Sequence, residues 1–116
     1  MKRSNTSSIF FSCVMIIMST AGFAHAQPPS LNAYAYYKRG VTYDDKAYYY
    51  KAISEFTKAI HIDPSYAMAY YNRSITYFLK KDYDNAWNDI YKLQELGIQI
   101  HPSFLIMLRE DSGRER

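Results

Sequence analysis

The sequence is poor in the residues that build disulfide, metal and phosphate sites. Its single cysteine, Cys13, lies in an apolar stretch near the N-terminus, so the rest of the chain offers no disulfide framework, thiol nucleophile or cysteine metal site. It has no glycine-rich phosphate loop and no Gly-x-Ser-x-Gly motif. His61 and His101 have no partner at metal-ligand spacing, and we expect each to cap a helix or face solvent. Asp44 and Asp45 suit a turn better than acid–base chemistry. We therefore predict no cofactor, no metal and no enzyme.

The N-terminal segment 1–26 has the form of a secretory signal peptide. Lys2 and Arg3 give a positive start, the stretch 9–23 forms an apolar run, and Ala24-His25-Ala26 is a small-x-small cleavage site. An uncleaved membrane anchor is the alternative, but polar residues interrupt the run, which falls short of the roughly 18 apolar residues that a span needs. We expect export, with the periplasm of a Gram-negative bacterium as the destination and secretion as the next alternative.

An excess of charge of one sign is also lacking once the leader is set aside. The chain has 14 basic and 11 acidic residues, and two of the basic residues, Lys2 and Arg3, lie in the leader. The remainder is close to neutral, which does not indicate a nucleic-acid-binding surface.

What the chain does contain is a copy of part of itself. The stretch 33–64 begins again at Ala67. A shift of 34 superimposes Ala33 on Ala67, Ala35 on Ala69, Tyr36 on Tyr70, Tyr37 on Tyr71, Arg39 on Arg73, Thr42 on Thr76, Tyr43 on Tyr77, Lys46 on Lys80, Tyr49 on Tyr83, Ala52 on Ala86 and Lys58 on Lys92. Such a period is typical of stacked helical repeats, in which each unit buries its apolar face against a neighbour.

The first copy has aromatic and small residues at fixed spacing, followed by a proline: Tyr36, Gly40, Tyr43, Ala52, Phe56, Ala59 and Pro64. With these positions the repeat resembles the tetratricopeptide family over residues 33–98. The second copy keeps Tyr70, Ser74, Tyr77, Ala86 and Ile90, then departs at Leu93 and Ile98, which we interpret as the end of the array. In this pattern large rings wedge into a helical hairpin while small residues let the two backbones approach.

The sequence therefore predicts an all-α fold of antiparallel hairpins in a tetratricopeptide superhelix. Apolar periodicity predicts helices over about 33–45, 48–62, 66–80, 83–96 and from 102 to 109 or 110. Asp63 or Ser65 should cap the third helix and Asp82 the fourth, while Gly97 ends the fourth and Pro102 opens the fifth. The divisions are a leader (1–26), a lead-in (27–32), two repeats (33–66 and 67–100), a capping helix (101–112) and a tail (113–116).

By resemblance to the family, the first helix of each hairpin lines a concave groove. The residues placed there are Tyr34, Tyr37, Lys38, Val41, Asp45, Met68, Tyr71, Asn72, Ile75 and Leu79. This aromatic and aliphatic surface suits an extended peptide or amphipathic helix of a partner protein, although these side chains could instead pack on one another. The carboxylate-gripping mode of some family members is not expected, because Tyr37 and Val41 stand where Lys and Asn are needed.

Thirteen tyrosines lie beyond the leader. We expect packing roles for Tyr36, Tyr43, Tyr49, Tyr70, Tyr77 and Tyr83, and surface contacts for Tyr48, Tyr50 and Tyr66. The single tryptophan, Trp87, should pack against the capping helix.

Five consecutive apolar residues, 104–108, form the centre of the capping helix. Phe104, Leu105 and Leu108 suffice for one buried face, which leaves Ile106 and Met107 facing water. Terminal repeats normally present a polar outer surface. We therefore hypothesise that this helix self-associates, giving a homo-oligomer, or docks on a partner. The alternative function is accordingly a structural subunit of an envelope or secretion assembly.

Overall fold

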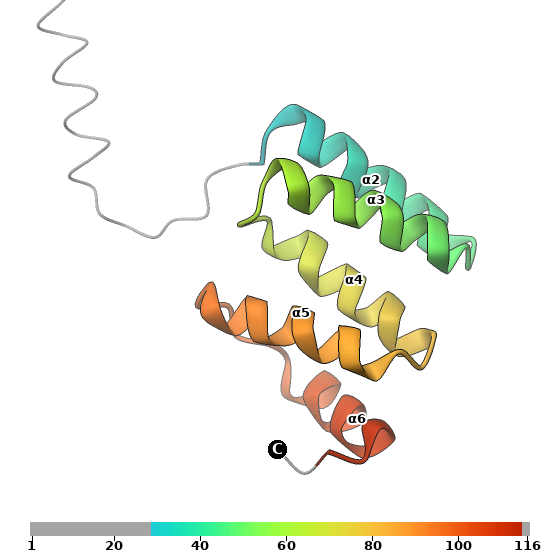
Figure 1. Ribbon diagram of the computed structural model, residues 1–116, viewed down its shortest axis with the longest axis vertical. Coiled ribbons are helices and arrows are strands. Elements are labelled where there is room, and N and C mark those ends of the chain that lie inside the picture. The colour runs from blue at the N-terminus through green and yellow to red at the C-terminus, as the bar shows by residue number, and fades with distance from the viewer. Residues whose placement is uncertain (1–28, 115–116) are drawn as a thin grey trace, which may run out of the picture.

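Helices stacked side by side and joined by short connections make up the described chain (Figure 1). The computed structural model describes residues 29–114, so the predicted signal peptide lies outside the described residues. Helices α2 (Leu31–Asp45) and α3 (Tyr49–Ile62) form the first hairpin, and α4 (Ala67–Leu79) and α5 (Tyr83–Glu95) form the second. Helix α6 (Pro102–Ser112) lies beside α5 at the C-terminal end of the stack. The predicted all-α architecture is confirmed, with each helix boundary close to expectation.

Three of the helices begin with side-chain caps. The Ser30 hydroxyl accepts a hydrogen bond from the Ala33 N–H (3.2 Å), and the Asp82 carboxylate accepts one from the Asn85 N–H (3.5 Å). The His101 ring caps α6, where Pro102 occupies the first turn. The predictions for Asp82, His101 and Pro102 are confirmed.

Helix α4 begins differently from the expectation. Tyr66 occupies its N-cap position, and no side chain accepts a hydrogen bond there. The Asp63 carboxylate instead accepts from the Ser65 N–H (3.0 Å) and the Ser65 hydroxyl (2.7 Å). Asp63 therefore stabilises the turn between the hairpins. An aspartate before a helix can form such a turn instead of capping the helix.

The second residue after each of α2, α4 and α5 has the same backbone conformation. Ala47, Lys81 and Gly97 each adopt a left-handed backbone, with φ of 59°, 61° and 76°. At each end the following N–H reaches back to a carbonyl of the last helical turn, as in Tyr48 N to Tyr43 O at 2.9 Å. Only Gly97 is a glycine, so the first two turns are held by their hydrogen bonds despite a conformation that favours glycine.

The hairpin seams have the expected alternation of large and small residues. A Cβ added at Gly40 would lie 2.6 Å from the Phe56 ring, so the ring packs directly on the Gly40 backbone. Ala52 and Ala59 of α3 are fully buried. The second hairpin has Ser74 and Ile90 at the positions of Gly40 and Phe56, and both are fully buried. Where Ser74 replaces the smaller Gly40, Ile90 therefore replaces the larger Phe56.

The second hairpin and α6 share a buried cluster, which we call the C-terminal core. Its buried members are Tyr70, Ala86, Trp87, Ile90, Leu93, Ile100, Phe104 and Leu108. The Trp87 indole N–H also donates to the Ser112 hydroxyl at 3.1 Å. Ile106 and Met107 remain 49% and 47% exposed. The expectations for Trp87 and for both faces of α6 are confirmed. Within the part of the chain described, we find no helix whose length and apolar character would let it cross a membrane.

Candidate functional site

The candidate groove is formed by α2 and α4, the first helices of the two hairpins. At its centre the Tyr37 hydroxyl accepts a hydrogen bond from the Asn72 side-chain amide at 3.1 Å. The Tyr37 ring centroid lies 5.1 Å from that of Tyr66 and 6.0 Å from that of Phe56. Tyr37 therefore ties the hairpins together, and the Asn72 amide is already engaged by a neighbour.

An open hollow of about 600 Å³ lies at the N-terminal end of this groove. We call it the apolar hollow, and its lining residues are Pro29, Leu31, Tyr34, Tyr37, Tyr66 and Met68. Three of them present large apolar surface to solvent, since Leu31, Tyr34 and Met68 are 82%, 45% and 51% exposed. Clustered exposed apolar residues of this kind mark interaction surfaces more often than isolated ones do.

The apolar hollow has a cation beside it and none within its lining. The Lys38 ammonium lies 5.8 Å from the centroid of the Tyr34 ring, on the same helix. A segment bound in the hollow could therefore bury an apolar side chain and place an acidic group near Lys38.

The structure brings together some of the predicted groove residues and separates others. Tyr34, Tyr37 and Met68 share the apolar hollow, and Asn72 contacts it through Tyr37. Tyr71 packs instead on Phe104, with ring centroids 6.0 Å apart, and Ile75 packs against the C-terminal core. Val41 is half-buried and both Asp45 and Leu79 are exposed, and none of the three lines the hollow. The other predicted contact residues, Ile106 and Met107, lie on α6.

The expectation for Tyr66 is wrong, because this residue is buried between the hairpins and only 8% exposed. Burial, reinforced by the neighbouring tyrosines Tyr37 and Tyr34, raises the pKa of Tyr66 to about 12. Tyr48 and Tyr50 are exposed as expected. Sequence reasoning also missed Leu31, although the apolar periodicity of α2 starts at this residue.

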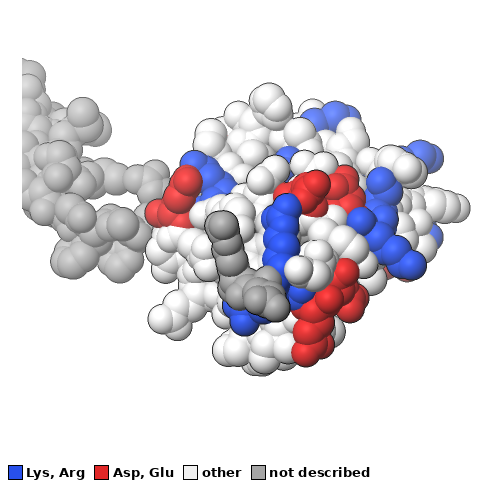
Figure 2. Space-filling model, turned by 60° about the horizontal axis from the view of Figure 1, so that its bottom comes forward, with Lys and Arg blue, Asp and Glu red and all other residues white. Residues whose placement is uncertain are grey.

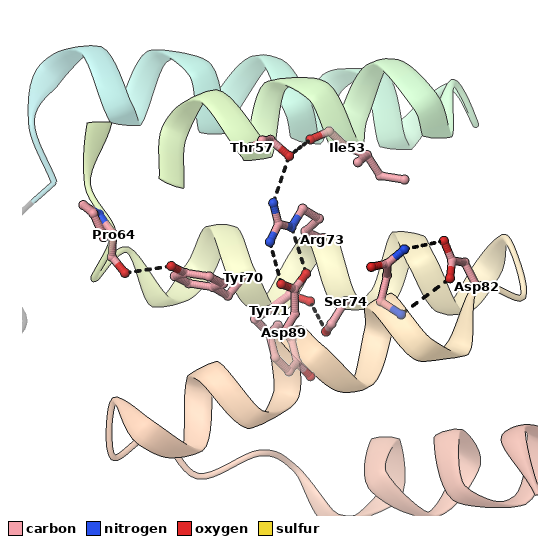
Figure 3. Close-up of polar contacts among 10 residues, drawn as sticks. Ile53, Thr57, Pro64, Tyr70, Tyr71, Arg73, Ser74, Asp82 and Asp89 are labelled. Atoms are coloured by element: carbon pink, nitrogen blue, oxygen red, sulfur yellow. Dashed lines mark hydrogen bonds and ion pairs between the residues drawn. The ribbon is translucent and has the colours of Figure 1, made fainter. Parts of the chain in front are cut away.

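Polar contacts inside the stack fix the helices that carry the groove. In Figure 3 the Arg73 guanidinium donates to both oxygens of Asp89, at 2.6 and 2.8 Å, and to the Thr57 hydroxyl of the preceding hairpin at 2.9 Å. Burial raises the pKa of Asp89, and the Arg73 hydrogen bond opposes that rise. Across the seam between α2 and α4, the Thr76 hydroxyl donates to Asp44 at 2.9 Å, and burial raises the pKa of that carboxyl.

Metal ligands do not cluster in the described part of the chain. Residues 29–114 contain no group of three or more His, Cys, Asp or Glu side chains that could hold a metal ion. His61 is exposed, and His101 serves as a helix cap. On the face seen in Figure 2, basic and acidic side chains are interspersed among uncharged residues. This mixture gives that face no continuous basic patch of the kind that binds nucleic acid.

Comparison with known families identifies the repeat. Two tetratricopeptide repeat family models match the chain, one over residues 33–66 and the other over residues 55–88. The first match covers α2 and α3, and the second runs from α3 through α4 into α5. Neither the curated proteins nor the solved structures gave a match. The two matches, the period of the repeat and the stacked hairpins together show tetratricopeptide repeats over residues 33–88.

Proposed function

We propose that this protein is a non-enzymatic adaptor or scaffold that holds a peptide or helix of a partner protein in the groove between α2 and α4. Tetratricopeptide repeats generally mediate protein–protein interaction. The observation that carries the proposal is the apolar hollow, where Leu31, Tyr34 and Met68 expose adjoining apolar surface. Burial of such surface by a partner side chain would supply the main favourable free energy of binding.

The chemistry of the groove narrows the kind of partner. Asn72 donates one amide hydrogen to the Tyr37 hydroxyl, so part of its hydrogen-bonding capacity is already used between the two hairpins. The lining of the hollow is apolar and aromatic, with Lys38 close to Tyr34. The partner segment that suits this site carries a bulky apolar anchor, flanked by an acidic residue directed at Lys38.

Cross-linked co-purification tests the groove. The decisive variant is Tyr34→Asp with Met68→Asp, because both side chains are about half exposed and their replacement leaves the Tyr37–Asn72 hydrogen bond in place. The matched control is Ile62→Asp with Ile98→Asp, which changes two exposed apolar residues outside the hollow by the same charge. The groove variant should lose a protein that wild type and control both retain. Equal recovery by all three proteins, or recovery of none, would contradict the proposal.

The second candidate function is a structural subunit that docks through α6. Exposed Ile106 and Met107 on the terminal helix favour it, because a terminal helix in contact with water is usually polar there. Ile106→Lys with Met107→Lys should then abolish partner recovery, or dissociate a homo-oligomer measured by light scattering. A monomer at high concentration whose mass is unchanged by this variant would exclude self-association.

Export is proposed from the leader alone. Mass spectrometry of the protein from an envelope fraction should give a chain that begins at Gln27 if the signal peptide is cleaved. A mass that includes Met1, together with resistance to extraction from membranes, would instead support the uncleaved anchor.

A further inference from the structure

A second hollow lies at the edge of the stack where the α2–α3 turn meets the C-terminal end of α4. Its volume is about 340 Å³, and its lining residues are Ala47, Tyr48, Tyr49, Tyr50, Lys51 and Lys80. We call it the tyrosine–lysine hollow. It shares no lining residue with the apolar hollow. The two surfaces could therefore bind different segments.

The tyrosine rings of this hollow are largely exposed. Tyr48 is 54% exposed and Tyr50 is 78% exposed, the largest exposure of any described tyrosine. Tyr49, at the position repeated by Tyr83, is the half-buried member of the three. Exposed tyrosines are effective contact residues, because they bury large area with little loss of rotamer entropy.

Two ammonium groups lie over these rings. The Lys80 nitrogen is 3.6 Å from the centroid of Tyr50, reaching from the end of α4 to α3. The Lys51 nitrogen is 5.4 Å from the centroid of Tyr48. Among the residues that the structure describes, neither lysine is within salt-bridge distance of a carboxylate. The lining therefore carries two positive charges and no negative charge.

The second repeat has carboxylates at the positions equivalent to two of these tyrosines. A shift of 34 takes Tyr48 to Asp82 and Tyr50 to Asp84. There, Asp82 accepts hydrogen bonds from Asn85, and Asp84 forms an ion pair with Arg114. The first repeat has the exposed rings of Tyr48 and Tyr50 in place of these carboxylates, and Lys80 stands at the position of Arg114 without an acidic partner in the lining.

We propose that the tyrosine–lysine hollow is a docking surface for an acidic, extended segment of a partner protein. A carboxylate of that segment would lie between Lys51 and Lys80, and its apolar atoms would cover the Tyr48 and Tyr50 rings. The complementarity of charge selects this occupant, because an uncharged apolar segment would bury two ammonium groups without a counter-charge. The surface is separate from the groove and does not depend on it.

Fluorescence anisotropy with a short labelled peptide of alternating glutamate and leucine tests this surface on the purified protein. The peptide should bind wild type, with an affinity that falls as salt is added. A peptide with lysine in place of glutamate should not bind. Lys51→Glu with Lys80→Glu should weaken binding of the acidic peptide by about tenfold or more.

The matched control is Lys46→Glu with Lys81→Glu. It makes the same change in net charge on two exposed lysines that are outside the lining. This variant should weaken binding less than about threefold, through long-range charge alone. A second variant, Tyr48→Ala with Tyr50→Ala, keeps both lysines and should also weaken binding, because it removes the rings.

Three results would overturn the proposal. The first is no binding of the acidic peptide by wild type that is folded by circular dichroism. The second is equal weakening by the lysine variant and its control. The third is loss of binding in the groove variant Tyr34→Asp with Met68→Asp but not in the lysine variant, which would assign the acidic segment to the groove.

Discussion

The two hairpins contain the same arginine–carboxylate pair in different surroundings. Arg39 pairs with Glu55 and Arg73 with Asp89, and a shift of 34 takes the first pair onto the second. The Arg39 side chain is 54% exposed, whereas that of Arg73 is 15% exposed. The cause is position in the stack, because the first hairpin covers Arg73 and Thr57 accepts its third hydrogen bond. Equivalent residues in a repeat protein can therefore differ greatly in energetic importance.

The geometry of the two pairs differs as well. Arg73 donates to both oxygens of Asp89, as a guanidinium does in its strongest pairing. Arg39 directs two nitrogens at a single oxygen of Glu55, whose other oxygen accepts from Lys58 at 3.1 Å. The Arg73 pair therefore has the geometry of an internal structural contact, and the Arg39 pair that of a surface network.

Removal of the carboxylate from each pair should give the largest difference in unfolding free energy between the two hairpins. Asp89→Ala leaves the Arg73 guanidinium buried without its partner, which should cost about 3–5 kcal/mol. Glu55→Ala leaves Arg39 and Lys58 in contact with water, so the expected loss is clearly smaller. Urea unfolding followed by circular dichroism measures both values. Equal losses in the two variants would show that burial between hairpins does not set the difference.

The seam of each hairpin offers a second test. Gly40→Ala drives a Cβ against the Phe56 ring, at 2.6 Å, and overpacking of this kind should cost about 1–3 kcal/mol. The double variant Gly40→Ser with Phe56→Ile copies the pair found at Ser74 and Ile90, and it should recover much of that loss. Thermal unfolding distinguishes this from simple helix propensity, which would make Gly40→Ala stabilising.

The contact between hairpins should have a smaller effect. Thr57→Val removes the hydroxyl that accepts from Arg73 and should cost about 1 kcal/mol. Thr42→Val is the control, because Thr42 also donates to the carbonyl one helical turn earlier but makes no hydrogen bond to an arginine in the described chain. The control should change the unfolding free energy by less than about 0.5 kcal/mol. A loss in the control as large as that in Thr57→Val would assign the effect to the threonine's own helix.

The fold was predictable because the repeat itself encodes it. Gly40 and Phe56 on one side, and Ser74 and Ile90 on the other, specify where two helices pack, so the hairpins follow from the period of the repeat. Gly97 was likewise a readable helix end. The helix ends at Ala47 and Lys81 have no glycine. The end of the apolar periodicity located both, and the following cap Asp82 also marked the second.

The candidate site was predictable only in part, because exposure depends on position in the stack. Tyr37 and Met68 follow from the family pattern, and both line the apolar hollow. Leu31 precedes the first repeat and contributes because no described helix covers it. Tyr66 looked like a surface residue in the sequence, and the packing of α4 against the first hairpin buries it. A single sequence cannot show such burial, because it arises from contacts between units.

The smallest expected effect concerns the equivalent positions Tyr66 and Ile100, which a shift of 34 superimposes. Both residues are 8% exposed, and each precedes the helix that follows a hairpin. Only Tyr66 can ionise. The folded state raises the pKa of Tyr66 to about 12, above the value near 10 of an unfolded tyrosine. The stability gained by keeping the phenol neutral is thus complete below about pH 10 and is lost as pH rises towards 12. Between about pH 9 and pH 11, the melting temperature of Tyr66→Phe should therefore fall less than that of wild type, by about 2–5 °C. If Tyr66→Phe shows the same pH dependence as wild type, alkaline instability does not originate at the junction of the hairpins.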